Sequence, residues 1–151
     1  KETINFRLLI IGRGTYFNKF KKYINEKKLN KNVKILDFKK NPFPYLKRAD
    51  IFILTSKYEG LPNVLLEAAT LKKNIISTNC PTGPREILKS GKYGFLCNIG
   101  DYRQISKKIL YYNSTNKKTL DSITNAAYNS LDRFDYKYNL YKYYYEIKKL
   151  V

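Results

Sequence analysis

Two acidic residues, Glu59 and Glu67, frame a place where the sequence changes from an apolar run to a helical pattern. The run at 51–54, Ile-Phe-Ile-Leu, is short and bulky, which is typical of a buried parallel strand. Gly60 then gives the backbone freedom for a tight turn. Pro62 suits the first position of a helix, because a backbone N–H is not needed there. The pattern predicts a strand, a turn and a helix, with one carboxylate in the turn and the other in the helix.

The first turn of that helix predicts an anion-binding site. Backbone N–H groups at this end have no partner within the helix, and the helix dipole makes the end positive. Leu61, Asn63 and Val64 can each offer such an N–H. Phosphate needs donors of this kind, whereas neutral hydroxyl groups need acceptors such as the two carboxylates. The combination favours a ligand with phosphate in its middle and a sugar at each end.

Further candidate residues flank this site. The Ser56 hydroxyl could contact the ligand, or it could cap the end of the strand. Gly83 and Arg85 lie in the loop that follows the next predicted strand. The Arg85 guanidinium could bind a phosphate through two hydrogen bonds, or it could pair with Glu86.

A glycine turn at Gly12 follows the first apolar run of the chain. Its Gly-x-Gly spacing is incomplete as a dinucleotide-binding pattern, because Phe17 stands where a third glycine is required. We interpret it mainly as a strand-to-helix connection, with proximity to the ligand as the alternative. A polar loop at 37–43 follows the second strand, and its backbone could hold a nucleobase.

Strand and helix patterns alternate along the chain, which predicts an α/β fold. Helices between parallel strands build a Rossmann-like, doubly wound parallel sheet, here with further helices at the C-terminal end. Ligands of such sheets bind at the carboxyl ends of the strands, where the candidate loops fall. The predicted strands span 4–12, 33–36, 51–54, 74–78 and 94–97, and the predicted helices span 16–28, 62–71, 84–88, 101–112, 116–131 and 134–151.

Burial can be predicted from the same patterns. We expect the strand at 4–12 to be buried and the helix at 16–28 to turn Phe17, Phe20, Tyr23 and Ile24 inward. Asp101 is expected to cap the helix that follows it, and either Thr115 or Asn116 is expected to cap the next one. The helix at 134–151 is crowded with tyrosine and lysine. We favour the interpretation that its tyrosines cover the edge of the core; the alternative is an interface with another domain or a membrane surface.

The composition is that of one globular domain with a strong positive charge. The 151 residues include 30 Lys and Arg against 12 Asp and Glu, a net charge of +18. Most of the excess is lysine, which fits compositional drift or an anionic membrane surface. Nucleic acid is not an expected partner, because no DNA-binding or RNA-binding motif is present.

Metal and cofactor chemistry has little support in the residue types. The chain has no histidine, and the spacing of Cys80 and Cys97 suits neither a metal site nor a redox pair. We expect no cofactor, no metal and a reducing cytoplasmic compartment. No apolar run is long enough to cross a bilayer, and no signal peptide is recognisable. Because methionine is absent throughout, we expect the chain to be a fragment of a longer product.

The segment that holds both acids, YEGLPNVLLEA at 58–68, resembles the signature of the retaining, GT-B-fold glycosyltransferases of family 4. Four other pieces resemble this family in the same order and spacing. They are LIIGRG at 9–14, RADIFILTS at 48–56, PTGPREIL at 81–88 and GKYGFL at 91–96. Together the five pieces cover about residues 5–112.

The resemblance implies that residues 1–151 are the donor-binding, C-terminal half of a GT-B enzyme, without its N-terminal acceptor domain. It implies that Glu59 orients the donor sugar and that Glu67 holds the ribose hydroxyls. The leaving phosphate would assist the acceptor hydroxyl, with no metal required. The Arg and Lys that neutralise the diphosphate in this family would precede Lys1, so we expect the isolated chain to be inactive.

The loop CPTGP at 80–84 resembles most closely that of members that add N-acetylhexosamine or galactose-type units to bacterial surface glycans. The expected donor is therefore a UDP-hexose or UDP-N-acetylhexosamine. The expected acceptor is a glycan or a lipid-linked sugar. For a lipid-linked acceptor, the expected location of the protein is the inner face of the membrane. Two other functions stay open. One is a UDP-sugar epimerase, against which the lack of histidine argues, and the other is a non-enzymatic basic module that binds anionic polymer or membrane.

Overall fold

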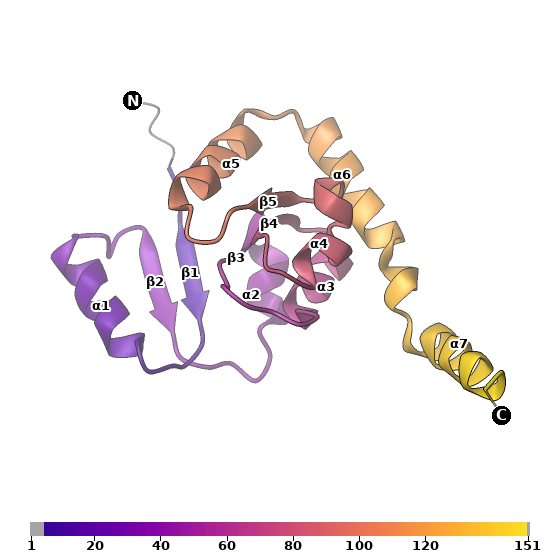
Figure 1. Ribbon diagram of the computed structural model, residues 1–151. Helices are drawn as coiled ribbons and strands as arrows, with labels where there is room; N and C mark the ends of the chain where they lie inside the picture. Colours follow the sequence, from indigo (N-terminus) through magenta and orange to yellow (C-terminus); the bar gives the residue numbers. More distant parts are fainter. Residues whose placement is uncertain (1–4, 151) are drawn as a thin grey trace. The chain divides into compact units, whose positions relative to one another are not determined.

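The computed structural model describes residues 5–150, and the chain divides into two compact units, unit 1 (Lys1–Tyr45) and unit 2 (Leu46–Val151). Every strand pair that it describes is parallel, and successive strands are connected through helices (Figure 1). The predicted Rossmann-like α/β fold class is confirmed by this arrangement.

Unit 1 contains β1 (Leu8–Ile11), α1 (Phe17–Glu26) and β2 (Val33–Leu36). The two strands pair in register, from Leu8 opposite Val33 to Ile11 opposite Leu36. Helix α1 buries Ile24. The short helix α2 (Phe43–Arg48) contains the point at which the chain passes from unit 1 to unit 2.

The burial expected in unit 1 is wrong in two places. Strand β1 leaves Leu8, Leu9 and Ile10 between 36% and 40% exposed, and α1 leaves Phe20 52% and Tyr23 53% exposed. Periodicity predicts which side chains share a face, but burial also needs a partner surface. The two strands and one helix of unit 1 supply too little of it. The first residue of the predicted strand, at position 4, lies outside the described residues.

Unit 2 carries β3 (Ile51–Leu54), α3 (Asn63–Thr70), β4 (Asn74–Thr78) and β5 (Phe95–Cys97), with α4 (Pro84–Ile87) and the 3₁₀ turn η1 (Lys89–Gly91) between β4 and β5. Strand β4 is central and pairs with β3 on one side and β5 on the other. Its Ile75 and Ile76 are buried, and α3 adds the fully buried Leu65 and Ala68 to the core. Strand β3, which was expected to be buried, is half-buried along its length. The junction between β3 and α3 is therefore anchored by the buried face of α3 and by the pairing of β3 with the buried β4.

Strand pairing falls into two sets. Among residues 5–150, β1 pairs with β2, and β3, β4 and β5 pair in that order. Alternation in the sequence predicts that strands exist and run parallel, but it does not fix which strands are neighbours.

The C-terminal helices begin at side-chain caps, which satisfy N–H groups of the first turn. They are α5 (Tyr102–Ser114), α6 (Lys117–Asn129) and α7 (Tyr136–Lys148), and the 3₁₀ turn η2 (Leu131–Phe134) lies between α6 and α7. Asp101 accepts from the N–H of Gln104, and Asn116 accepts from that of Thr119, both at 2.9 Å. The predicted cap at Asp101 is thus confirmed, and of the two candidates Thr115 and Asn116 the structure shows Asn116.

The favoured interpretation of the last helix is wrong. All six tyrosines of α7 are between 63% and 77% exposed, so they do not cover the edge of the core. The tyrosines are distributed around the helix, so no single face could bury them all. The interface interpretation stays a hypothesis.

Candidate functional site

The β3–α3 junction has the predicted course, with one correction at its proline. Pro62 has φ −72° and ψ 99°, which is extended backbone, so it is the N-cap and Asn63 is the first helical residue. Its carbonyl accepts a hydrogen bond from the N–H of Leu65 at 2.9 Å. The rigid φ of proline fixes the direction in which the chain enters α3.

The predicted N–H donors are available at this helix end. Within residues 5–150, the backbone N–H groups of Leu61, Asn63 and Val64 make no hydrogen bond. Pro62 provides no side-chain cap, and the first turn contains no acidic residue. The residues are also exposed, Leu61 by 48% and Val64 by 38%. This end of α3 can therefore accept an anion.

Both carboxylates are uncommitted in the described part of the chain. Glu59 and Glu67 are half-buried. Neither carboxylate forms a hydrogen bond or an ion pair with another residue in the range 5–150, so an ion pair of Glu67 with a lysine is not observed. Two half-buried acids without partners can accept hydrogen bonds from ligand hydroxyls.

The loop that carries Glu59 is held by side chains at and just after the end of β4, which sequence reasoning missed. Thr78 Oγ1 donates to the carbonyl of Ser56 at 2.6 Å, and Cys80 Sγ donates to the same carbonyl at 3.1 Å. Thr82 Oγ1 donates to the carbonyl of Glu59 at 2.5 Å. The only sequence signal was the alternation of small hydroxyl and thiol side chains at 78, 80 and 82.

The conformationally demanding glycine of the site is Gly83, not Gly60. Gly83 has φ 78°, and a Cβ on it would overlap Gly60 O and lie 2.5 Å from Pro62 Cδ. Gly60 does not have a positive φ, and a Cβ added to it would meet nothing within 4 Å. The freedom expected of Gly60 is therefore not required by its own conformation; Gly83 lets the two loops approach.

Two other predicted residues keep their side chains free. The Arg85 guanidinium is exposed and forms no ion pair with Glu86 or any other described residue. The Ser56 hydroxyl makes no hydrogen bond among residues 5–150, so it does not cap the strand end, and only the Ser56 carbonyl is engaged. Both side chains are free to contact a ligand.

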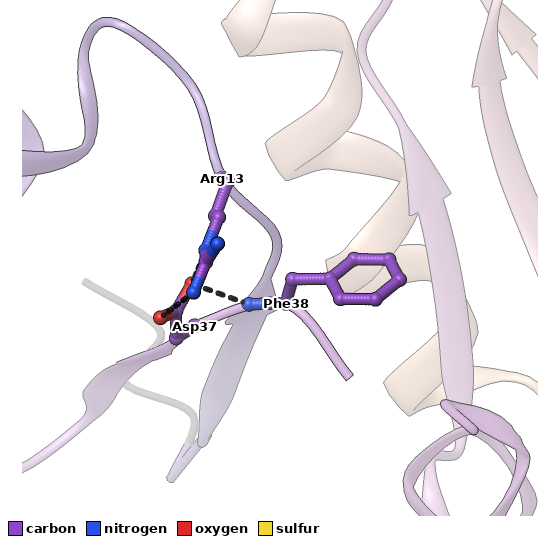
Figure 2. A network of polar contacts seen from close by, with 3 residues as sticks. All are labelled: Arg13, Asp37 and Phe38. Atoms are coloured by element: carbon purple, nitrogen blue, oxygen red, sulfur yellow. Dashed lines mark hydrogen bonds and ion pairs between the residues drawn. The ribbon is translucent and has the colours of Figure 1, made fainter. Parts of the chain in front are cut away.

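Gly12 belongs to unit 1, where it follows β1 with φ 155°. The next residue forms the ion pair shown in Figure 2, which sequence reasoning did not identify. Arg13 Nε and Nη2 donate to the two carboxylate oxygens of Asp37 at 2.6 and 2.9 Å. The N–H of Phe38 also donates to Asp37 at 2.7 Å, while the Phe38 ring extends away from the pair. The pair ties together the carboxyl ends of β1 and β2.

These contacts predict an acid-stable ion pair. The hydrogen bonds from Arg13, then that from Phe38, lower the pKa of Asp37 from 3.8 to about 2. A lowered pKa means that the ionised form is favoured in the folded chain, so the pair is complete above pH 3.8 and is lost as the pH falls through 2. The effect on stability is expected to be small, because both side chains are exposed and screened.

The titration can be followed by carboxyl carbon NMR shifts. We expect Asp37 to titrate near 2 and, in Arg13→Gln, to move back toward 3.8. Arg7→Gln removes the same charge from a position just before β1 and should leave Asp37 unchanged. Titration of Asp37 near 3.8 in the unmodified chain would contradict the pair.

Other features of the described residues are not part of this site. A hollow of about 300 Å³ is lined by Asn74, Tyr112, Leu120 and neighbouring residues. Asn74 is the first residue of β4, so this hollow lies at the other end of the strand from Thr78. No group of three or more Cys, Asp or Glu side chains within residues 5–150 is placed to hold a metal ion. None of the helices in that range is long and apolar enough to span a bilayer.

Known proteins resemble the chain in sequence and in fold. A model of the family described as Glycosyl transferases group 1 matches residues 1–130. An uncharacterized glycosyltransferase of Methanocaldococcus jannaschii is 48% identical over 84 residues, which are 56% of this chain and 21% of that protein. The crystal structure of Anabaena HepE in complex with UDP has a TM-score of 0.82 at 21% identity, over 97% of this chain and 41% of the Anabaena chain.

A third relative is named for its substrate. It is the N-acetylgalactosamine-N,N'-diacetylbacillosaminyl-diphospho-undecaprenol 4-alpha-N-acetylgalactosaminyltransferase of Campylobacter jejuni, 28% identical over 95 residues, 63% of this chain and 26% of that protein. The chain spans about a fifth to a quarter of these two relatives' length. The likeness to HepE is a likeness of fold.

Proposed function

Because the chain belongs to the group 1 glycosyl transferases, we propose that it binds the donor, a nucleotide diphosphate sugar, in the reaction of a glycosyltransferase. The observation that carries the proposal is the short segment 59–67 around the start of α3, which contains both the N–H groups without partners and the two uncommitted carboxylates. The amides of Leu61, Asn63 and Val64 would hold the diphosphate. Glu67 would accept hydrogen bonds from the ribose hydroxyls, and Glu59 from those of the sugar.

The loops around this centre would complete the donor site. Gly83 brings its loop against Gly60. Arg85 is only two residues further along the chain, and its free guanidinium would bind a phosphate of the donor. The free hydroxyl of Ser56 lies at the end of β3, on the same edge of the sheet.

We propose a UDP-hexose or UDP-N-acetylhexosamine as the donor. Support comes from HepE, whose structure contains UDP, and from the Campylobacter relative, whose name specifies N-acetylgalactosaminyl transfer. That name also specifies a diphospho-undecaprenol acceptor, which is a lipid. A lipid-linked acceptor, and with it a place at the cytoplasmic face of a membrane, fits the net charge of +18.

Transfer would proceed with retention and without a metal. The bond between the anomeric carbon and the phosphate oxygen breaks, a bond to the acceptor oxygen forms on the same face, and the acceptor proton passes to the leaving phosphate. Stabilisation of that leaving group by the amides of α3 lowers the barrier. The acceptor site would lie in a separate N-terminal domain of a longer polypeptide, and the basic pair that the family resemblance implies at the start of the donor domain would assist the amides.

The donor site can be tested on the 151-residue chain by titration calorimetry with UDP. We expect weak binding that persists at moderate salt and with EDTA. Glu67→Ala should weaken it at least about tenfold, because hydrogen bonds to a charged acceptor are worth about 1.5–3 kcal/mol. Glu26→Ala, which removes the same charge from the exposed end of α1, should change it less than about twofold.

A single-stranded oligonucleotide is the control for simple charge attraction. A basic module would bind the oligonucleotide with a steep dependence on salt. Binding to the oligonucleotide alone, or equal effects of Glu67→Ala and Glu26→Ala, would contradict the donor site.

A further inference from the structure

The three donor side chains at and just after the end of β4 lie at alternate positions and all reach the same loop. Thr78 and Cys80 are buried and donate to Ser56, at the base of the loop, while Thr82 donates to Glu59, at its tip. We propose that Thr78, Cys80 and Thr82 are positioning residues that fix the loop at 55–61, and that Thr82 sets the position of Glu59 and hence the fit of the donor's sugar. The last part rests on the proposed function.

The hydrogen bonds of the loop at 55–61 support this role. Within residues 5–150, the backbone of 55–61 makes no hydrogen bond to another backbone group. The ladder between β3 and β4 ends at Leu54 opposite Ser77. The hydrogen bonds that do reach the loop come from Thr78, Cys80 and Thr82. A short irregular segment without a ladder takes its conformation from such side-chain contacts.

The three residues differ in burial, and this decides which of them can be changed without disturbing the core. Thr78 and Cys80 are 1% and 2% exposed, so a change at either would disturb the core as well as the loop. Thr82 is exposed, and its hydroxyl contacts the backbone of the proposed sugar-orienting residue directly. Thr82 is therefore the position at which loop placement can be altered with little effect on folding.

Thr82→Val removes the hydroxyl and keeps the side-chain shape, and Thr82→Ser restores the hydroxyl. Thr70→Val is a matched control, because Thr70 is also exposed and its hydroxyl also donates to a backbone carbonyl, that of Leu66 at 2.8 Å, near the far end of α3. All three variants are expected to fold as the unmodified chain does, as judged by circular dichroism.

The first measurement needs no ligand. Backbone ¹⁵N order parameters of Glu59 and Gly60 should fall from about 0.85 to below about 0.6 in Thr82→Val, and stay high in Thr82→Ser and Thr70→Val. Unchanged order parameters in Thr82→Val would overturn the positioning role. This result is independent of whether the chain binds a nucleotide sugar.

The second measurement compares UDP with UDP-glucose and UDP-N-acetylglucosamine. We expect Thr82→Val to bind the sugar nucleotide about fivefold more weakly than the unmodified chain does, which corresponds to about 1 kcal/mol. Its affinity for UDP should change less than about twofold. Thr82→Ser should restore the affinity. Equal losses for UDP and its sugar derivative would overturn the link to Glu59. Absence of binding by the unmodified chain would instead overturn the proposed function, and the order parameters would still decide the role of Thr82 in the loop.

Discussion

Replacement of Gly83 by alanine is expected to lower the free energy of unfolding by about 3 kcal/mol and to abolish most of the UDP binding. Gly83 has φ 78° and ψ −73°, a backbone conformation that is unfavourable for every other residue. The added Cβ would also overlap Gly60 O and lie 2.5 Å from Pro62 Cδ. Gly60 O is a backbone atom and Pro62 is buried, so neither atom can move aside unless the loop itself moves.

The displaced loop is the one that carries Glu59 and leads into α3. Relief of the overlap requires either α4 or the segment at 59–62 to shift, and the second movement turns the amides of Leu61 and Asn63 away from their present direction. A loss of affinity therefore accompanies the loss of stability. This coupling distinguishes Gly83 from a glycine that only permits a turn.

Gly100→Ala separates the two contributions. Gly100 has φ 79°, nearly that of Gly83, but a Cβ there would meet nothing within 4 Å. We expect it to cost about 1 kcal/mol, from backbone strain alone, and to leave UDP binding intact. Urea unfolding followed by circular dichroism measures both values. Equal destabilisation by the two variants would show that the loops are not in contact as described.

The elements that the sequence predicts best are those specified by local chemistry. The strands at 33–36, 51–54 and 74–78 were predicted with the bounds that the structure has, because each is a short β-branched or apolar run between polar residues. The cap at Asp101 was predicted, and that of α6 was narrowed to Thr115 or Asn116, because a single side chain satisfies the helix end.

The features that could not be predicted are contacts between segments that lie far apart in the sequence. Thr82 and Glu59 are 23 positions apart, and only the folded loops show that their hydrogen bond exists. Gly60 and Gly83 look equally permissive in sequence, but the neighbour that forbids a side chain is present only at Gly83. Exposure of Phe20 in α1 and of the α7 tyrosines has the same cause, because periodicity does not reveal which surface covers a face.

In a full-length glycosyltransferase that contains this chain, Glu59→Ala is expected to lower kcat by about 10²- to 10³-fold, with a much smaller change in KM for the donor. Glu59 is placed in the loop, outside the amides of α3 that would bind the diphosphate. Its loss removes the orientation of the sugar but leaves most of the binding energy of the nucleotide. An interaction used mainly in the transition state lowers kcat and kcat/KM together.

The companion variants test whether the carboxylate itself is required. Glu59→Gln keeps the size of the side chain but replaces one acceptor oxygen by a donor, so it should lose most of the same activity. Glu26→Ala, on the exposed end of α1, should retain the rate of the unmodified enzyme. Circular dichroism establishes that each variant is folded. Near-normal turnover by Glu59→Ala would refute the role assigned to this residue.

The same assay applied to the isolated 151 residues is expected to give no turnover. The α3 amides and Glu59 would hold and orient a donor, whereas the acceptor site is proposed to lie in a separate domain. A bound donor without an oriented acceptor does not gain the rate advantage of proximity. Measurable transfer by the isolated chain would show that it contains the acceptor site as well, and the division of labour proposed for the longer polypeptide would then be wrong.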